Sequence, residues 1–247
     1  MKKIKVKPYE KLSVVYDHLM SHVNYTLWTN YVYRVSRKFV NKESSVLELA
    51  GGNGKFSKIF KNYYPNIVVT DLSFSMLSSR ENGLPKVCCE MTSLPFKKKF
   101  DFIYSTFDSV NYLLTKKDLF KLFTEVKNIL SDKGIFTFDV SLEKNSEIFV
   151  SNHQKTGKTN NITYEHISIY NRYSRIHRNI FEIKMGDGSV YKEIHKQKIY
   201  PFRTYFELLS KAGLYVLECF EAFTFKPGNE NSKRLQFIVK KNSNAFI

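Results

Sequence analysis

Residues 46–54 read Val46-Leu47-Glu48-Leu49-Ala50-Gly51-Gly52-Asn53-Gly54, and this stretch decides the fold. An apolar run carries an acid near its end, a turn of small residues follows, and residues 55–60 have the pattern of a helix start. A strand, a glycine loop and a helix in this order let the backbone approach a nucleotide-like ligand closely. The stretch therefore predicts a scaffold that holds a cofactor, and it leaves the choice of substrate to the rest of the chain.

Strand and helix patterns alternate along the first 141 residues. Helices are expected where apolar residues recur at three- and four-residue steps or a cap precedes them: residues 9–40, 55–63, 73–80 and 116–130. Strands are expected in the short apolar runs between them: residues 45–49, 66–71, 87–91, 100–105 and 135–140. Gly134 is expected to end the last of these helices as a left-handed cap. The alternation predicts an α/β fold with a doubly wound, mostly parallel seven-stranded sheet.

The pattern changes after residue 141 from helical to alternating. Residues 162–171, 174–185 and 189–200 alternate polar and apolar side chains, and Gly186-Asp187-Gly188 signals a hairpin turn. We therefore expect a small antiparallel insertion of three strands over one end of the sheet. Residues 202–212 return to a helical pattern that Gly213 stops, and residues 214–220 and 234–240 are expected to close the sheet as an antiparallel pair.

We expect a single domain over residues 1–247, built from three parts. Residues 1–42 are predicted to form N-terminal lid helices. Residues 43–141 and 201–247 are predicted to form the cofactor-binding core, and residues 142–200 the antiparallel β insertion over the active site.

The 247-residue chain carries a formal net charge of +16, which would suit a nucleic acid or another anionic partner. Its lysines are scattered along the chain, and Lys, Asn, Ile, Phe and Tyr are all frequent, as in proteins from AT-rich genomes. We interpret the charge as compositional and keep nucleic acid as the minority alternative for a partner.

Three cysteines, Cys88, Cys89 and Cys219, form neither a disulfide framework nor a zinc-type spacing. They read as small buried side chains in a reducing compartment, and we predict no metal site. The basic N-terminus is not followed by an apolar leader, and no apolar run approaches membrane-spanning length. These features predict a cytoplasmic protein with no membrane partner.

Three acidic residues stand at the predicted ends of the first three strands: Glu48, Asp71 and Glu90. Open α/β folds bind ligands at this carboxyl edge. The glycine loop alone also nearly satisfies a dinucleotide pattern, but a pyrophosphate would lie badly beside Glu48. Asp71 suits a ribose diol because a carboxylate accepts two hydroxyl hydrogen bonds. Glu90 can accept from an exocyclic amine while Met91 packs on the purine, so the acids favour a cofactor with a cationic centre and no phosphates.

These residues resemble the class I S-adenosylmethionine-dependent methyltransferases. The first motif of that family, an acid before a glycine-rich loop, corresponds to residues 48–54, with Glu48 where Asp is commoner and Ala50 where Gly is usual. The second motif corresponds to residues 69–77, and Glu90 matches the acid on the adenine side. The resemblance covers nearly the whole chain, and it implies a methyltransferase domain that uses S-adenosyl-L-methionine as its cofactor.

Other segments resemble the small-molecule branch of this family, which includes amino-sugar N-methyltransferases. They are residues 107–113, residues 193–200 and the opening segment 15–20 with Tyr25 and Trp28. The resemblance therefore implies a small-molecule acceptor beneath N-terminal lid helices. The implied cofactor-binding residues are Tyr16, Trp28, Glu48, Ala50, Gly51, Gly52, Gly54, Asp71, Leu72, Met76, Glu90, Met91 and Ser105.

Each of these residues also has a purely structural interpretation. Asp71 could be a helix N-cap, and Glu48 could bind backbone amides at the end of its strand. Met76 suits a core position, and core packing competes with lid contacts for Tyr16 and Trp28. Taken together at three successive strand ends, the acids favour the cofactor interpretation.

The acceptor side rests on three candidate catalytic residues. Asp108 and Asn111, after the fourth strand, could align an amine or a hydroxyl, although Asp108 could instead cap a turn and Asn111 could touch the methionyl part of the cofactor. Strand alternation places His195 on one face with Glu193. His195 could serve as a general base there, or this face could be solvated or packed in a homodimer.

The predicted function is methyl transfer from S-adenosylmethionine to a small-molecule nitrogen or oxygen, by alignment of the reactants with at most one general base. The segment after the fourth strand, residues 105–108, lacks the Asn/Asp-Pro-Pro-aromatic run of nucleic-acid amino methyltransferases and the cysteine nucleophile of cytosine-carbon methyltransferases. Two alternatives stay open: an RNA methyltransferase that acts by another route, motivated by the charge, and a non-catalytic module of the same fold that holds the cofactor.

Overall fold

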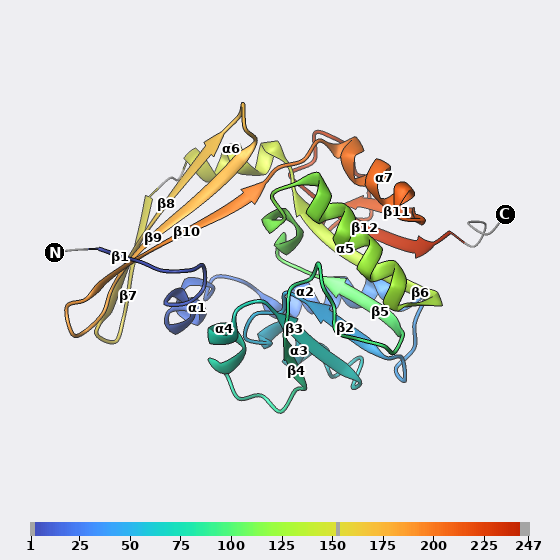
Figure 1. Ribbon diagram of the computed structural model, residues 1–247, viewed down its shortest axis with the longest axis horizontal. Helices are drawn as coiled ribbons and strands as arrows, with labels where there is room; N and C mark the ends of the chain where they lie inside the picture. The colour runs from blue at the N-terminus through green and yellow to red at the C-terminus, as the bar shows by residue number, and fades with distance from the viewer. Residues whose placement is uncertain (1–2, 152–153, 243–247) are drawn as a thin grey trace.

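Two β-sheets organise the molecule, one of seven strands and one of five (Figure 1). A computed structural model describes residues 3–151 and 154–242. The seven-stranded sheet has the order β11-β12-β6-β5-β2-β3-β4. Its strands are β2 Val46–Leu49, β3 Ile67–Asp71, β4 Lys86–Cys88, β5 Phe100–Ser105, β6 Leu130–Ser141, β11 Leu214–Glu221 and β12 Arg234–Lys241.

The strand directions give this sheet a doubly wound topology. β2 pairs in parallel with β3 and β5, β3 with β4, and β5 with β6. β12 runs antiparallel to both β6 and β11. The fold class predicted from the sequence, a mostly parallel seven-stranded sheet closed by an antiparallel pair, is confirmed.

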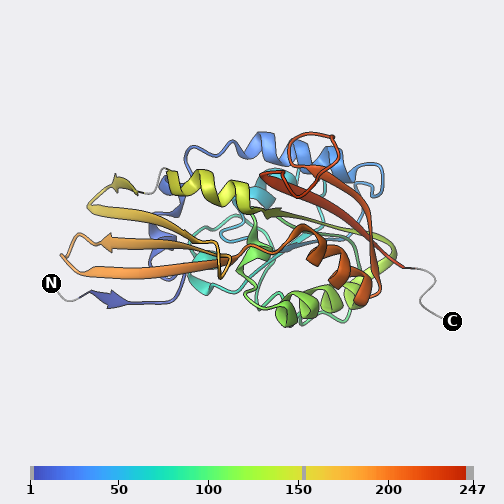
Figure 2. The same ribbon diagram turned by 90° about the horizontal axis from the view of Figure 1, so that it is seen from above.

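Helices cover both faces of the seven-stranded sheet. α2 Tyr25–Ser36 lies on one side, and α5 Lys116–Ile129 and α7 Phe202–Lys211 lie on the other (Figure 2). Val32 of α2 packs in one apolar core with Phe60 of α3 Lys55–Phe60, and Phe123 of α5 packs in another with Leu209 of α7. Apolar side chains at helical spacing therefore form two cores, which fix the sheet between the two layers of helices.

The five-stranded sheet extends away from this body as an arm (Figure 1). Its order is β1-β10-β9-β8-β7, with β1 Ile4–Lys5, β7 Gln154–Thr159, β8 Ile162–Asn171, β9 Ile176–Lys184 and β10 Val190–Lys198. The three expected antiparallel strands are β8, β9 and β10. The two edge strands, β1 and β7, were not expected. β1 is only two residues long, and it joins the sheet by parallel pairing with β10, which is far away in the sequence.

Two expectations about local structure are wrong. Residues 9–40 do not form one helical run: η1 Leu12–Val14 and α1 Tyr16–Leu19 precede α2, and Asn24 caps α2 by accepting the Leu27 N–H at 2.9 Å. Gly134 does not cap α5 but lies inside β6, where a Cβ would lie 2.8 Å from the Asp101 carbonyl oxygen. A close approach between neighbouring strands, not a left-handed cap, therefore explains this glycine.

The remaining helices of the described residues are three short ones: α4 Phe74–Ser78, η2 Ser109–Tyr112 and α6 Glu143–Ser151. The last two were not predicted. Across residues 3–151 and 154–242, no helix combines the length and the apolar character that crossing a membrane requires.

Candidate cofactor and acceptor site

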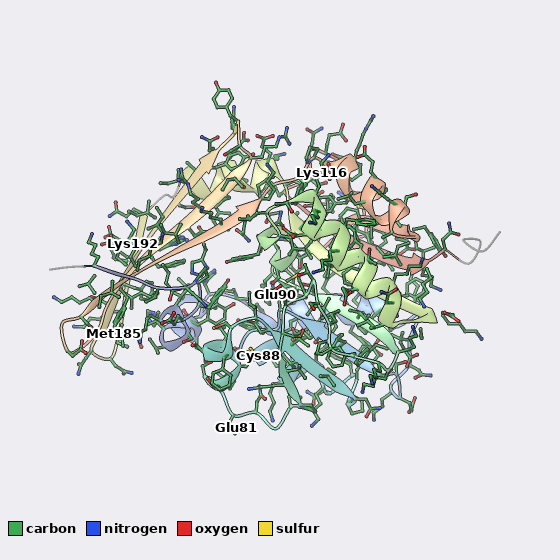
Figure 3. The ribbon with its side chains drawn as sticks, in the orientation of Figure 1. Glu81, Cys88, Glu90, Lys116, Met185 and Lys192 are labelled. Atoms are coloured by element: carbon green, nitrogen blue, oxygen red, sulfur yellow. The ribbon has the colours of Figure 1, made fainter. Side chains whose placement is uncertain are left out.

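A cavity of about 1240 Å³ lies between the carboxyl edge of the seven-stranded sheet and the arm. The lining residues that fall between positions 48 and 91 form one side of it, and we refer to them as the sheet-edge half. The lining residues that fall within 7–12, 106–112 and 155–199 form the other side, and we refer to them as the arm half. Figure 3 shows Glu90 near the middle of the view, between the sheet edge and the arm.

The glycine loop folds as a tight turn between β2 and α3. Ala50 has a φ of 54° and Gly52 a φ of 58°, both in the left-handed region. Gly51 packs directly on the acid of the motif, because a Cβ there would lie 2.5 Å from Glu48 Oε2. A side chain at Gly51 would collide with Glu48 and Val69, so this close approach of the loop to the strands requires glycine. Ala50 adopts a conformation that glycine adopts without strain, which explains why glycine is common at this position in the motif.

Glu48 is buried beneath this loop and lines the cavity. The Ser57 hydroxyl donates to Glu48 Oε2 at 2.5 Å, and the Ser57 and Tyr104 hydroxyls lie 2.6 Å apart. Burial raises the pKa of Glu48 to about 8; the hydrogen bond from Ser57 opposes this shift and the nearby Asp71 adds to it. A cation that entered the cavity would favour the ionised form of this carboxyl.

Asp71 joins the glycine loop to the start of α4. Its Oδ2 accepts the Gly52 N–H at 2.8 Å, and its Oδ1 accepts the Ser73 N–H at 2.8 Å. Burial raises the pKa of Asp71, and the amides of Ser73, Gly52 and Leu72 oppose that shift. The N-cap of α4 is Ser73, which accepts the Met76 N–H. Each carboxylate oxygen keeps a second lone pair, so Asp71 can hold the loop and still accept from a ribose hydroxyl.

The remaining predicted cofactor contacts of the sheet-edge half also face the cavity. Glu90 is exposed and lies two residues after the end of β4, with Met91 next to it. Leu72 is exposed at the rim, whereas Met76 is buried and packs near Gly52. Met76 is therefore both a core and a lining residue, and the two interpretations of it are compatible.

Tyr16 and Trp28 line the cavity from the N-terminal segment. Trp28 packs on Phe107 with ring centroids 4.4 Å apart and meets the edge of Phe223 at 4.5 Å. Tyr16 meets Tyr9 edge to face at 6.0 Å. These residues thus combine aromatic packing with a position on the cavity wall.

Three predicted site residues do not line the cavity: Gly54, Ser105 and Asn111. Gly54 has a φ of 73° and is the N-cap of α3, so it shapes the loop rather than facing a ligand. Ser105 is buried within β5. Asn111 is buried, donates to the Lys198 carbonyl at 2.8 Å and accepts the Ser141 N–H at 3.0 Å. Asn111 therefore ties η2 to β6 and β10, and its amide is committed to that task, contrary to a direct catalytic role.

Asp108 does line the cavity, just after β5. Its Oδ2 accepts from the Ser141 hydroxyl at 2.7 Å and from Gln197 Nε2 at 3.2 Å. Arg234 Nη2 lies 3.3 Å from Asp108 Oδ1, and the same guanidinium pairs with buried Asp139. Asp108 has a φ of 48°, so this network holds it in a left-handed conformation that is uncommon for a residue with a side chain.

His195 lines the arm half at the centre of a chain of polar groups. His195 Nε2 lies 3.0 Å from Glu193 Oε2, and His195 Nδ1 lies 3.1 Å from the Tyr112 hydroxyl. The Tyr112 and Tyr9 hydroxyls lie 2.7 Å apart. Both His195 and Glu193 are buried, and Tyr9 and Tyr112 line the cavity. The structure thus brings together the imidazole and carboxylate that strand alternation placed on one face.

Sequence reasoning did not identify Tyr9, Tyr112 or Arg234 as site residues. Tyr9 lies in a turn, Tyr112 ends η2, and Arg234 begins β12, so none belongs to a periodic pattern that points to the cavity. Tyr9 reaches the site because β1 pairs with β10. There, the Tyr9 hydroxyl contacts the hydroxyl of Tyr112, 103 positions away, and no local pattern in the sequence indicates this contact.

Comparisons with known proteins agree with this geometry. Residues 47–138 match the family described as a methyltransferase domain. The Bacillus subtilis protein YqeM, whose name marks it as a proposed methyltransferase, is 29% identical over 94% of this chain and 97% of its own length. A protein of Methanocaldococcus jannaschii with no described function, MJ1252, is 28% identical over 97% of this chain and 86% of its own.

Solved structures share the whole architecture. An S-adenosylmethionine-dependent methyltransferase from Clostridium acetobutylicum superposes with a TM-score of 0.79 at 24% identity, covering 94% of this chain and 98% of its own. The sugar N-methyltransferase KedS8 from Streptoalloteichus superposes with a TM-score of 0.74 at 17% identity, covering 92% and 93%. The fold is therefore that of the class I methyltransferases, with residues 47–138 as its methyltransferase-domain segment. The family match and this fold both support S-adenosyl-L-methionine as the cofactor.

Proposed function

We propose that this protein transfers a methyl group from S-adenosylmethionine to a nitrogen or oxygen atom of a small molecule. The observation that carries the proposal is the grouping of Glu48, Asp71 and Glu90 around the glycine loop, on a cavity that the arm closes from the other side. The acids suit a cationic cofactor with a ribose and an adenine, and they suit a pyrophosphate poorly.

The chemistry assigns a limited task to the protein. When bound, S-adenosylmethionine supplies a methyl group on a cationic sulfur, and its transfer breaks the carbon–sulfur bond with the electron pair staying on sulfur. Asp71 and Glu90 would hold the cofactor, and the loop at Gly51 and Gly52 would contact its amino-acid part. The arm half would align the nucleophile and exclude water, which are the main sources of rate in such a displacement.

A small-molecule acceptor is supported by the form of the cavity. Its arm half is walled by Tyr164, His166, His177 and Phe181 on β8 and β9, with His166 stacked on Phe181 at 4.4 Å. The structures with the same fold include proteins described as sugar N-methyltransferases. A concave pocket that combines aromatic rings with polar groups is typical of small-molecule sites.

The direct test is a labelled-methyl experiment on cell extract. The protein is incubated with methyl-labelled S-adenosylmethionine and an extract of the cells that make it, and the nucleic-acid, protein and small-molecule fractions are separated. Label in the small-molecule fraction is expected. Label confined to RNA, with RNA retention that weakens as salt rises, would identify the RNA methyltransferase instead. Cofactor binding with no label in any fraction would identify a non-catalytic module.

A further inference from the structure

The hydrogen bonds of Glu193 fix its charge and its role. Glu193 accepts three backbone N–H groups of the N-terminal segment, from Tyr9 at 2.7 Å, Lys11 at 2.6 Å and Leu12 at 2.9 Å. Burial raises the pKa of Glu193, but the hydrogen bonds from His195 and from the amides of Leu12 and Lys11 outweigh burial and hold it below its ordinary value. A carboxylate that accepts this many donors is ionised at neutral pH, so it offers His195 only acceptor atoms.

This acceptor sets the direction of every hydrogen bond beyond it. His195 Nε2, 3.0 Å from Glu193, must carry a proton and donate. In the neutral imidazole, which is the form that can act as a base, His195 Nδ1 then holds a lone pair and accepts from the Tyr112 hydroxyl at 3.1 Å. Since the Tyr112 proton points to His195, the Tyr112 oxygen accepts from the Tyr9 hydroxyl at 2.7 Å. The oxygen of Tyr9 is left with free lone pairs at the cavity wall.

We propose that Tyr9, Tyr112 and His195 form a directed proton relay, oriented by Glu193, that removes the proton of the methyl acceptor. This inference rests on the proposed function. The acceptor N–H or O–H proton passes to the Tyr9 oxygen, the Tyr9 proton passes to Tyr112, and the Tyr112 proton passes to His195 Nδ1. The products are two neutral tyrosines and an imidazolium ion that Glu193 stabilises. Tyr9 is the group that meets the acceptor, and Glu193 is a positioning residue.

Other titratable groups surround the relay without interrupting it. His166 on β8 lies close enough to His195 for their charges to interact, and Asp71 and Asp108 act in the same way on Tyr9. The two carboxylates oppose a phenolate at Tyr9, as does burial, so the pKa of Tyr9 lies well above its ordinary value. The tyrosines therefore pass a proton on in concert and do not store negative charge.

In this relay, the function of His195 as the base also depends on the N-terminal segment, residues 9–12. Glu193 holds the amides of residues 9, 11 and 12, and the same segment carries the Tyr9 hydroxyl into the site. Tyr9 has a φ of 64°, a left-handed conformation that is held by the hydrogen bond from its backbone N–H to Glu193 and by its ring contact with His195 at 4.5 Å. Displacing this segment would remove both the entrance of the relay and the donors that keep Glu193 ionised.

The first test needs no acceptor and no cofactor. In protein with ¹⁵N-labelled histidine, two-bond ¹H–¹⁵N correlation spectra at pH 7.5 report which ring nitrogen of His195 carries the proton. We expect the Nε2–H form, and in Tyr112→Phe a shift of the Nδ1 resonance with Nε2 still protonated. Tyr173→Phe is the matched control, since Tyr173 is an exposed tyrosine in the turn between β8 and β9 and does not line the cavity. An Nδ1–H form in the wild type would overturn the relay.

The second test measures methyl transfer into the small-molecule fraction of the extract over pH 6–9. Tyr9→Phe and Tyr112→Phe should each lower the rate about 10- to 100-fold at pH 7, with cofactor affinity unchanged, and the loss should shrink as pH rises. Tyr173→Phe, at an exposed position outside the cavity, should stay within about twofold by the same reasoning. Full rates in both relay variants would overturn the relay. If the wild type neither binds the cofactor nor transfers label, the proposed function fails, whereas the spectra still decide the direction of the hydrogen bonds.

Discussion

The two halves of the cavity are built in different ways. The sheet-edge half is local in sequence: Glu48, Asp71 and Glu90 lie within 43 positions and stand at successive strand ends. The arm half is assembled from distant segments, because Tyr9 meets Tyr112 and Tyr112 meets His195. A cofactor that serves many different acceptors can be bound by the same motif in each protein, whereas each acceptor needs a binding surface of its own. The methyl donor can therefore be inferred from a sequence motif, whereas the site of the methyl acceptor can be inferred only from tertiary contacts.

If this division is real, damage to the arm half should abolish transfer and spare cofactor binding. His195→Gln should lower methyl transfer into the small-molecule fraction by about 10²–10⁴-fold, the usual contribution of a general base. Calorimetry should show S-adenosylmethionine affinity within about threefold of the wild type, since a threefold change is under 1 kcal/mol. His22→Gln, at an exposed rim position, is the control. Equal loss of binding and transfer would show that the halves are not separate.

Glu48 should give the sheet-edge half a distinctive pH dependence. Its pKa is raised to about 8 in the folded protein, so the stability it confers is complete below its ordinary range and is lost as pH rises through about 8. Relative to Glu48→Gln, the wild type should lose at most about 1.4 kcal/mol of unfolding free energy per pH unit between pH 5 and 8. Urea unfolding at pH 5, 6.5 and 8 measures this difference, and parallel curves for the two proteins would contradict a neutral buried Glu48.

Asp71→Ala should weaken cofactor binding, which the His195 variant is expected to leave unchanged. Losing a charged hydrogen-bonding partner should weaken S-adenosylmethionine binding by about 1–3 kcal/mol, and the freed amides of Gly52 and Ser73 add to the effect. Calorimetry is the measurement. Asp132→Ala changes an acid that is 97% exposed and serves as the control. An unchanged affinity in a folded Asp71 variant would reduce Asp71 to a structural link between the loop and α4.

The smallest effect is expected where the N-terminal segment touches the cofactor loop. Asp17 pairs with Arg80, lies 3.5 Å from Lys55 Nζ and accepts from Asn53 Nδ2 at 3.1 Å. These groups are partly exposed, so Asp17→Asn should weaken cofactor binding by about 0.2–1 kcal/mol, and less so at high salt. Calorimetry at two salt concentrations measures it. A loss comparable with that of Asp71→Ala would show that α1 belongs to the cofactor cradle.

The sequence was sufficient for the parts of the molecule that depend on local pattern. The seven-stranded sheet, the three central strands of the arm and the strand-end acids follow from periodicity and from residues close together in the chain. Gly134 was misread because a glycine after a helix resembles a cap, and only the neighbouring strand shows the close approach. The burial of Asn111 could not be predicted from the sequence, because it depends on a contact with β10, 87 positions away.

The same reasoning explains which half of the site the sequence left open. The strand alternation of β10 put Glu193 and His195 on one face, but it could not say what faced them. Tyr9 arrives there through β1, a strand of two residues, and Tyr112 through η2, which has no periodic signature. Such contacts join short, irregular segments that are far apart in the sequence. They depend on the tertiary packing of the whole domain, so local sequence patterns do not predict them.

The central claim, that the sheet-edge half is a cradle for S-adenosylmethionine and not for a dinucleotide, is tested most directly by calorimetry on the unmodified protein. S-adenosylmethionine and NAD are titrated separately into the same preparation. We predict saturable binding of one S-adenosylmethionine per chain and no binding of NAD, because the acids Asp71 and Glu90 beside the loop suit a cationic cofactor and suit a pyrophosphate poorly. Binding of NAD without binding of S-adenosylmethionine would contradict the account.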